Sequence, residues 1–195
     1  LARRTAMLGD VVEIGSWKGR STWYLARGLE DAGSSHRVVA IDPHLEGTRE
    51  AFERGVAEGG LAGRIDAHVA FSHELAEEFT GPVGLLWIDG DHSYASVRRD
   101  FEEWFPKLAS GGYVALHDTV NHWYGPTRLV RQLLVARCDL AAVGVIGTIT
   151  YARKTQPSQV NRLRGIWARA GFEAVTALRA RRMGRGPVNA APGEQ

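Results

Sequence analysis

This sequence of 195 residues has almost no cysteine, no long apolar run and no strong charge bias. Its single cysteine, Cys138, allows no internal disulfide and no cysteine-based zinc site, which fits a reducing compartment and predicts a cytoplasmic location. No apolar run reaches the length of a membrane span and no signal-peptide core is visible, so we expect no membrane partner. A formal net charge of only +2 argues against a nucleic-acid partner.

The composition is that of one ordinary globular domain, with 44% hydrophobic and 24% charged residues. A chain of this length can bury roughly 70% of its unfolded surface, enough for a full core of sheet and helices. We expect residues 1–180 to form a single domain and residues 181–195 to form a disordered tail rich in basic residues, glycine and proline. The arginines at 179–185 are interpreted as a solvated terminus. Because the sequence begins with Leu1, we expect a further segment upstream.

Short apolar runs alternate with amphipathic stretches along the chain. Strands are expected at residues 10–15, 37–42, 64–70, 83–89 and 112–118, followed by an antiparallel pair at 140–145 and 148–153. Helices are expected at 21–30, 48–58, 73–79, 93–108, 126–136 and 158–170, with Thr48 as the cap of the second. The helix at 93–108 has one apolar stripe of Val97, Phe101, Trp104, Phe105 and Leu108.

This alternation predicts an α/β protein with a Rossmann-like, doubly wound sheet, mostly parallel with one antiparallel closing strand. Ligands of such folds bind at the carboxyl ends of the strands. Polar residues stand at those ends, namely Glu13, Asp42, Ser72, Asp89 and Asp118. A solvated Asp-Gly turn is the simpler interpretation of WIDGDHSY at residues 87–94, but acids at four of five strand ends favour a shared site.

The stretch VVEIGSWKGRST, residues 11–22, forms the first of these ends. Gly15 and Gly19 flank a strand-to-helix turn, as a loop requires when its backbone closely approaches a ligand. Their spacing is not the G-x-G-x-x-G of dinucleotide-binding oxidoreductases, and Glu13 would repel a pyrophosphate but attract a cationic ligand. Asp42, in AIDPH, is placed to accept both hydroxyls of a ribose.

The E-x-G-x-x-x-G turn, the acid after the second strand and the segments WIDGDHSY and GGYVALHD resemble class I S-adenosylmethionine-dependent methyltransferases, over residues 10–153. The most similar subgroup comprises small-molecule O-methyltransferases that include the macrocin-type sugar enzymes, with catechol and caffeoyl-CoA enzymes as more distant kin. The resemblance implies S-adenosylmethionine as cofactor and methyl transfer to a hydroxyl of a small molecule, a sugar or natural product. It also implies a divalent cation, Mg²⁺ or Mn²⁺, and is compatible with a homo-oligomer.

Cofactor contacts are implied for nine residues: Glu13, Gly15, Ser16, Gly19, Ser21, Asp42, Ser72, His73 and Asp89. In the family pattern, the first four shape the loop around the methionine portion, and Ser21 binds its carboxylate. Ser72 and His73 match a Ser-Gln pair that contacts the adenine in the catechol enzymes. Histidine departs from that pattern, so an alternative is that His73 is a helix-cap neighbour that binds no ligand.

The implied metal ligands are Asp89, His117 and Asp118. Catechol-type enzymes have an Asp-Asn pair where this chain has His117 and Asp118. Two carboxylates and water suit Mg²⁺, whereas an imidazole would also admit Mn²⁺, Fe²⁺ or Zn²⁺. The alternative is that His117 packs under the loop and binds no metal.

His92 is the candidate catalytic base. It stands three residues beyond Asp89, where the catechol enzymes have a lysine base and the macrolide-sugar enzymes have a histidine. A sugar hydroxyl is a weak nucleophile, and a base that titrates near neutrality beside a metal would activate it. The alternative is that His92 merely neighbours Ser93 at the start of a helix.

Two other functions remain open. A binding or accessory protein could share this fold, because a fold alone does not fix an activity. A nucleic-acid methyltransferase is the other; those acting on exocyclic base amines have an Asn/Asp-Pro-Pro-aromatic segment after the fourth strand, where this chain has DGDH. Trp123 and Tyr124, just past the fifth predicted strand, either form one wall of the acceptor site or pack within their own loop.

Overall fold

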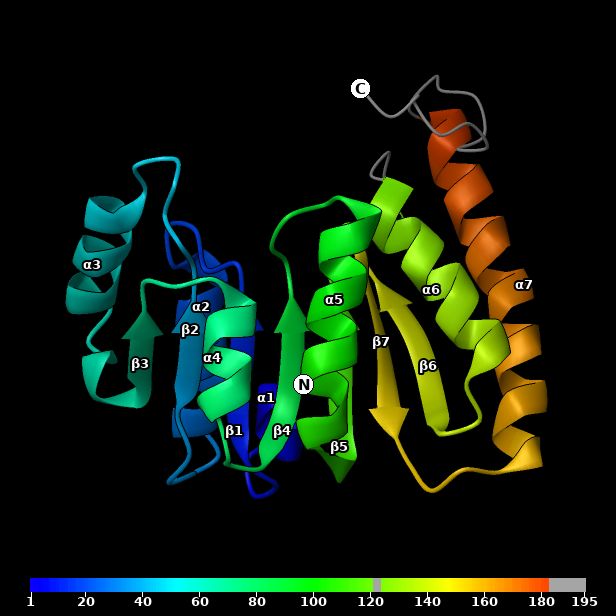
Figure 1. The fold of residues 1–195 in the computed structure, drawn as a ribbon, viewed down its shortest axis with the longest axis horizontal. Coiled ribbons are helices and arrows are strands. Elements are labelled where there is room, and N and C mark those ends of the chain that lie inside the picture. The colour runs from blue at the N-terminus through cyan, green and yellow to red at the C-terminus, as the bar shows by residue number, and fades with distance from the viewer. Residues whose placement is uncertain (121–123, 183–195) are drawn as a thin grey trace.

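The chain folds around one seven-stranded sheet, described for residues 1–120 and 124–182 in a computed structural model (Figure 1). The strand order is β3-β2-β1-β4-β5-β7-β6. The strands are β1 (Asp10–Ile14), β2 (Val38–Ile41), β3 (Ile65–His68), β4 (Val83–Ile88), β5 (Leu108–Leu116), β6 (Leu140–Ile146) and β7 (Ile149–Lys154). Only β7 runs antiparallel to its neighbours, β5 and β6, which confirms the predicted fold class.

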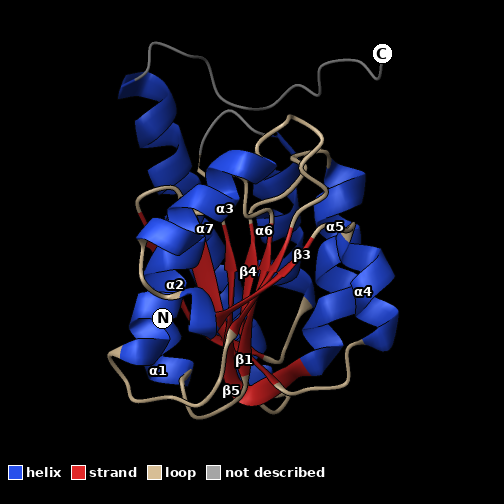
Figure 2. Cartoon of the chain, turned by 90° about the vertical axis from the view of Figure 1, so that its left-hand side faces the viewer, coloured by secondary structure: helices blue, strands red, loops and turns tan. Residues whose placement is uncertain are grey.

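Helices cover both faces of the sheet (Figure 2). They are α1 (Ala2–Thr5), α2 (Arg20–Glu30), α3 (Arg49–Glu58), α4 (Ser72–Glu78), α5 (Tyr94–Trp104), α6 (Tyr124–Ala136) and α7 (Gln159–Arg182), with short 3₁₀ turns at Ala62–Arg64 and Phe105–Lys107. Successive strand residues point to opposite faces. Val11 therefore packs with α1 and α2, whereas Val12 packs with α4, α5 and α6. Within the described residues, no helix is both long and apolar enough to cross a membrane.

The end of one predicted helix was wrong, and the predicted cap of another forms no capping bond. The helix expected at 93–108 ends at Trp104, because Pro106 lacks an amide hydrogen and the chain tightens into a 3₁₀ turn before β5. The apolar stripe expected along it is nevertheless buried throughout. Thr48 does occupy the N-cap position of α3, but its hydroxyl forms no capping bond and instead lies 2.9 Å from Nδ1 of His44.

The helix α7 is much longer than expected, because it continues past Ala170 to Arg182. Gly171 does not stop it, since glycine in a helix interior costs only about 1 kcal/mol relative to alanine. Phe172, Thr176 and Ala180 extend its buried face. Residues 181 and 182 of the expected tail are therefore helical, and the rest of that tail lies outside the described residues.

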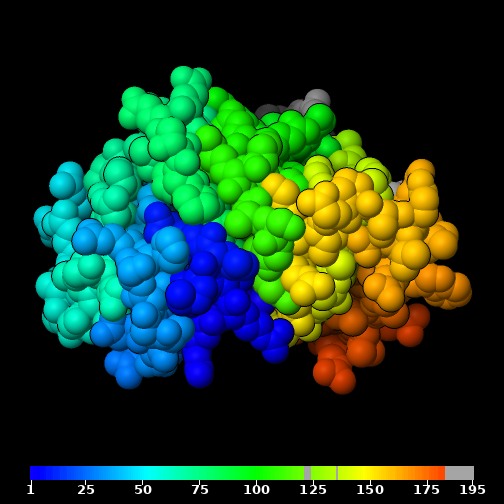
Figure 3. All heavy atoms as spheres, turned by 90° about the horizontal axis from the view of Figure 1, so that it is seen from below, coloured from blue at the N-terminus to red at the C-terminus, as the bar shows by residue number. Residues whose placement is uncertain are grey.

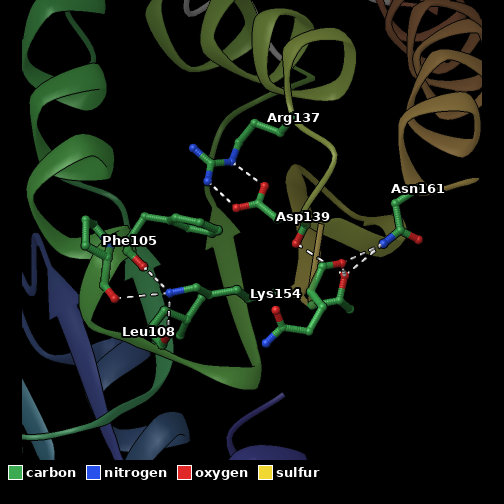
Figure 4. A network of polar contacts seen from close by, with 9 residues as sticks. Phe105, Leu108, Arg137, Asp139, Lys154 and Asn161 are labelled. Carbon is green, nitrogen blue, oxygen red and sulfur yellow. Dashed lines mark hydrogen bonds and ion pairs between the residues drawn. The ribbon is translucent and has the colours of Figure 1, made fainter. Parts of the chain in front are cut away.

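Lys154, at the end of β7, ties this strand to the turn that precedes β5 (Figure 4). Its ammonium donates hydrogen bonds to the carbonyls of Phe105, Pro106 and Leu108, at 3.0, 3.1 and 2.6 Å. Burial lowers the pKa of this amine. The three bonds hold the antiparallel strand β7 against β5, whose far end carries His117 and Asp118.

Candidate active site

The residues that follow the central strands are brought side by side by the register of the sheet. Ile14 is paired with Ile41 on one side and with Ile88 on the other, and Ile88 is paired with Leu116. The residues next along each strand therefore lie at one edge: Gly15, Asp42, Asp89 and His117. Parallel pairing alone thus assembles four of the predicted site residues.

A cleft of about 2070 Å³ opens at this edge of the sheet. Typical ligand pockets measure roughly 300–1,000 Å³, so the cleft has room for a cofactor and a second molecule. Of the twelve predicted site residues, ten line the cleft, and the two that do not are Glu13 and Gly19. Tyr124, predicted as part of an acceptor wall, also lines it, while Trp123 lies outside the described residues.

The turn after β1 requires glycine for two reasons. Gly15 has a φ of +87°, and a Cβ on it would lie 2.3 Å from the carbonyl oxygen of Asp89. Gly19 has a φ of +82° and is the N-cap residue of α2. Between them, Trp17 adopts a φ of +45°, which is uncommon for a bulky residue and is typical of loops held in place for function.

Asp42 holds this turn in its strained shape. Its Oδ2 accepts a hydrogen bond of 2.7 Å from the backbone amide of Trp17, and its Oδ1 accepts one of 2.7 Å from that of His44. Each carboxylate oxygen has a second lone pair, so the side chain can still accept a hydroxyl from the cleft that it lines. The loops after β1 and β2 are therefore joined through one carboxylate.

Glu13 and Ser16 each place a buried polar atom beneath the turn, and neither atom has a hydrogen-bond partner among the described residues. The carboxyl of Glu13 is fully buried; Thr22 donates a hydrogen bond of 2.5 Å to Oε2, but Oε1 has no hydrogen-bond partner in the described part of the chain. Burial raises the pKa of Glu13 to about 7. The hydroxyl of Ser16, a residue that lines the cleft, is equally unpartnered there. Unsatisfied buried polar groups are rare, and of these two only the Ser16 hydroxyl belongs to a residue that lines the cleft and could meet a polar ligand there.

At the other end of the cleft, Ser72 and His73 begin α4. The ring of His73 stacks on Phe71 with 5.6 Å between centroids, and both residues line the cleft, as expected for a surface that takes a flat base. The hydroxyl of Ser72 donates a hydrogen bond to Asp100.

Asp100 is a site residue that the sequence analysis missed. It is buried, it lines the cleft and burial raises its pKa to about 6. The signal was present, because Asp100 falls between Val97 and Trp104 on the apolar face of α5, where an acid is out of place unless it has a partner.

Three potential metal ligands converge on the floor of the cleft. One ligand atom from each of Asp89, His92 and Asp118 lies within 4.8 Å of the other two. Nε2 of His92 is 3.2 Å from Oδ2 of Asp118. Carboxylates and an imidazole at this spacing can hold a divalent cation such as Mg²⁺ or Mn²⁺. The sequence analysis placed Asp89 and Asp118 in such a group but assigned His92 only to catalysis.

His117 occupies a different position, beside this group. Its Nδ1 lies 3.1 Å from Oδ1 of Asp89 and 3.3 Å from Oδ1 of Asp118, and its Nε2 lies 3.1 Å from the hydroxyl of Thr148. The neighbouring carboxylate of Asp89 raises the pKa of the imidazole. Both ring nitrogens thus face protein groups, and His117 as a metal ligand stays a prediction.

The loop that carries His92 is held from two directions. Oδ1 of Asp91 accepts the backbone amide of Ser93 at 3.0 Å, and its Oδ2 accepts the Ser96 hydroxyl at 2.7 Å. A Cβ on Gly125 would lie 2.2 Å from the carbonyl oxygen of His92, so the start of α6 is seated directly against this loop. Asp91 therefore fixes the loop.

A model described as a methyltransferase domain matches residues 12–119, more than half of the sequence, and the chain belongs to this family. The fold and the family confirm the predicted class, the class I methyltransferases.

Two curated relatives are similar in sequence. "Uncharacterized protein y4gI" of Sinorhizobium fredii is 30% identical over 67% of this chain and 15% of its own length. "Uncharacterized protein R132" of Acanthamoeba polyphaga mimivirus is 25% identical over 59% of this chain and 53% of its own. The chain therefore spans only about a seventh of the first protein and about half of the second.

Three solved structures share the fold. The O-methyltransferase TomG of Streptomyces achromogenes has a TM-score of 0.62 with 20% identity over 79% of both chains. An O-methyltransferase of Bacillus cereus has a TM-score of 0.61 with 19% identity, covering 78% of this chain and 80% of its own. An rRNA methylase of Streptococcus thermophilus has a TM-score of 0.61 with 15% identity, covering 80% of this chain and 94% of its own.

Proposed function

We propose that this chain is an S-adenosylmethionine-dependent O-methyltransferase that acts on a hydroxyl of a small molecule, a sugar or natural product, with the help of a divalent cation. The observation that carries the proposal is the convergence of Asp89, His92 and Asp118 within 4.8 Å, directly beside the glycine turn of the cofactor loop. A methyl donor bound by the glycine turn and a hydroxyl bound by Asp89, His92 and Asp118 would therefore meet at the floor of the cleft.

Residues at three points of the cleft would hold the cofactor. Ser16 and Ser21, which both line the cleft, would offer hydroxyls to the amino-acid portion and its carboxylate, whereas Glu13, which does not line the cleft, would act only through the turn above it. Asp42 would accept the ribose hydroxyls while it keeps the Trp17 loop in shape. Phe71 and His73, whose rings stack, would take the adenine. Once bound, S-adenosylmethionine supplies an electrophilic methyl group, and a divalent cation lowers the pKa of a bound hydroxyl.

His92 takes the proton of the acceptor hydroxyl in this proposal. Asp118, 3.2 Å from its Nε2, orients the imidazole and stabilises its protonated form. The same nitrogen cannot both ligate a cation and be hydrogen-bonded to Asp118, so a role as third metal ligand is the competing assignment. Asp89 and Asp118 would hold the cation in either case.

The lining of the cleft best fits an acceptor molecule that contains a small ring. Trp87 and Tyr124 line the cleft near the Asp89 group and offer aromatic surfaces, which stack on flat or sugar rings. TomG, whose fold is similar, is an O-methyltransferase involved in tomaymycin synthesis. The lone cysteine and small net charge fit a cytoplasmic enzyme without a nucleic-acid substrate.

Transfer of a labelled methyl group from S-adenosylmethionine tests the proposal. We expect label to enter a panel of catechols, phenols and hydroxylated glycosides with Mg²⁺ or Mn²⁺, and EDTA to suppress it. Asp89→Asn and Asp118→Asn should abolish the metal response, whereas Asp66→Asn, an exposed acid on β3, should not. Labelling of ribosomal RNA in place of the panel would contradict the small-molecule assignment. Full turnover in exhaustively chelated protein would contradict the metal.

A further inference from the structure

The outward face of α7 is apolar and lacks cover from the described residues. Large hydrophobic side chains on this helix are exposed by 37% to 78%: Val160, Leu163, Ile166, Trp167, Val175 and Leu178. Leu163, Trp167 and Leu178 are nearly aligned along the helix, since residues three, four, seven or eleven apart share a face. We call these six side chains the α7 stripe. A patch of this kind normally marks an interaction surface.

The fold itself uses the opposite face of the helix. Asn161, Gly165, Phe172 and Thr176 are buried there, so only one of these inward residues is a large hydrophobic. Gly165 seats the helix closely on α6, because a Cβ on it would lie 2.3 Å from the carbonyl oxygen of Leu134. The attachment of α7 to the domain therefore does not account for the outward stripe.

Positive charge is concentrated on the same helix. It carries six of the chain's 24 basic residues but only one of its 22 acidic residues, which leaves the remainder of the chain net negative. Of the six arginines, only Arg169 forms an ion pair with a described residue, Glu173. Arg162 and Arg164 stand at the first turns and Arg179, Arg181 and Arg182 at the last, so both ends of the stripe are basic.

We propose that α7 is a peripheral docking surface for a membrane that contains anionic lipids. Tryptophan and leucine partition into the headgroup region, and arginines beside them pair with lipid phosphates. The helix lies at the outer edge of the molecule, and its last turns extend beyond α6 (Figure 1). Seen from below, its orange and red atoms form a corner of the surface, where a flat bilayer can approach (Figure 3).

A second copy of the chain fits this face less well. Because both ends of the helix are basic, pairing two copies in either direction would bring arginines against arginines. The lack of a membrane-spanning run led us to expect no membrane partner, and the present proposal revises that expectation, because docking on a bilayer surface needs only one apolar face. The inference does not depend on the proposed methyl transfer, because no residue of the stripe lines the cleft.

Sedimentation with lipid vesicles tests the inference on the full chain. We expect binding to vesicles of phosphatidylcholine with about a third phosphatidylglycerol and little binding to phosphatidylcholine alone, with loss of binding at high salt. Trp167→Ser should weaken binding at least tenfold. Met7→Ser is the matched control, because Met7 is 80% exposed and Trp167 is 78% exposed, but Met7 lies on a different surface. Arg164→Gln should weaken binding about fivefold.

Three results would overturn the inference. One is equal binding to neutral and anionic vesicles, and another is binding that Trp167→Ser leaves intact. The third is a dimer that Trp167→Ser converts to monomer in analytical ultracentrifugation, which would make a second copy the occupant. Unchanged circular dichroism spectra and Tm values in all variants verify that they are folded.

Discussion

Thr22 donates a hydrogen bond of 2.5 Å to one carboxyl oxygen of Glu13, while the other oxygen is buried without a partner among the described residues. Burial raises the pKa of this carboxyl to about 7, against 4.5 in an unfolded chain. The folded state thus favours the protonated form, and the resulting stability, complete below about pH 4.5, is lost as pH rises through 7. Glu13 therefore destabilises the ligand-free folded state at neutral and alkaline pH.

We predict that Glu13→Gln stabilises the ligand-free protein increasingly as pH rises. A shift of this size corresponds to about 3 kcal/mol above pH 7 and to less than about 1 kcal/mol at pH 5. Urea unfolding at pH 5 and pH 8 measures the difference. A variant that is less stable than wild type at pH 8 would contradict the account of Glu13.

Asp42→Ala should weaken cofactor binding by about 1–3 kcal/mol, the loss typical of hydrogen bonds to an ionised acceptor. It should also release the Trp17 amide, so Asp42→Asn, which keeps one carbonyl acceptor, should be milder. Calorimetry with S-adenosylhomocysteine measures both, with Asp66→Ala as the control on the neighbouring strand. Affinity equal to wild type in Asp42→Ala would remove Asp42 from the cofactor site.

His92→Ala should lower kcat by about 10²–10⁴-fold and leave cofactor affinity unchanged, as removal of a positioned base does. His68→Ala, at a half-buried histidine on β3 that does not line the cleft, is the matched control. Mn²⁺ binding separates the two roles of His92: unchanged Mn²⁺ affinity supports the base, whereas a large loss of Mn²⁺ affinity identifies a ligand. A variant that keeps more than about a third of wild-type kcat would exclude His92 as the base.

Lys154→Met should destabilise the fold by about 1–3 kcal/mol, because it leaves three backbone carbonyls without their donor. Lys107→Met should cost less, since Lys107 donates only one such bond, to Phe79. For a chain of this size, each kcal/mol lowers Tm by about 2–4 °C. Differential scanning calorimetry of the two variants checks the order, and equal Tm values would show that the Lys154 bonds do not hold β7 in place.

The central sheet was predictable because its strands are apolar throughout and each ends in a polar residue. Once parallel pairing is assumed, Ile14, Ile41, Ile88 and Leu116 must align, and the residues after them must meet. The approach of His92 to Asp118 was not predictable, since it depends on how the loop after β4 turns back, held by Asp91 and Gly125. Periodicity also failed for α7, whose outward face is the more apolar one.

The hydrogen bond of Asp100 is another feature that could not be predicted from the sequence alone. Its place on the apolar face of α5 was visible, but its partner Ser72 lies 28 residues earlier, and only the packing of α4 on α5 brings the two together. The same holds for Glu13. Its burial could be inferred from its place in an apolar strand, but the lack of a hydrogen-bond partner for its Oε1 among the described residues could not.

The backbone contact between Gly15 and Asp89 limits how this site can be redesigned. A side chain at position 15 would displace the peptide of Asp89, and the group of Asp89, His92 and Asp118 would move with it. The loop after β1 and the loop after β4 therefore cannot be changed independently of each other. An engineer who transplants either loop from a relative must transplant the other.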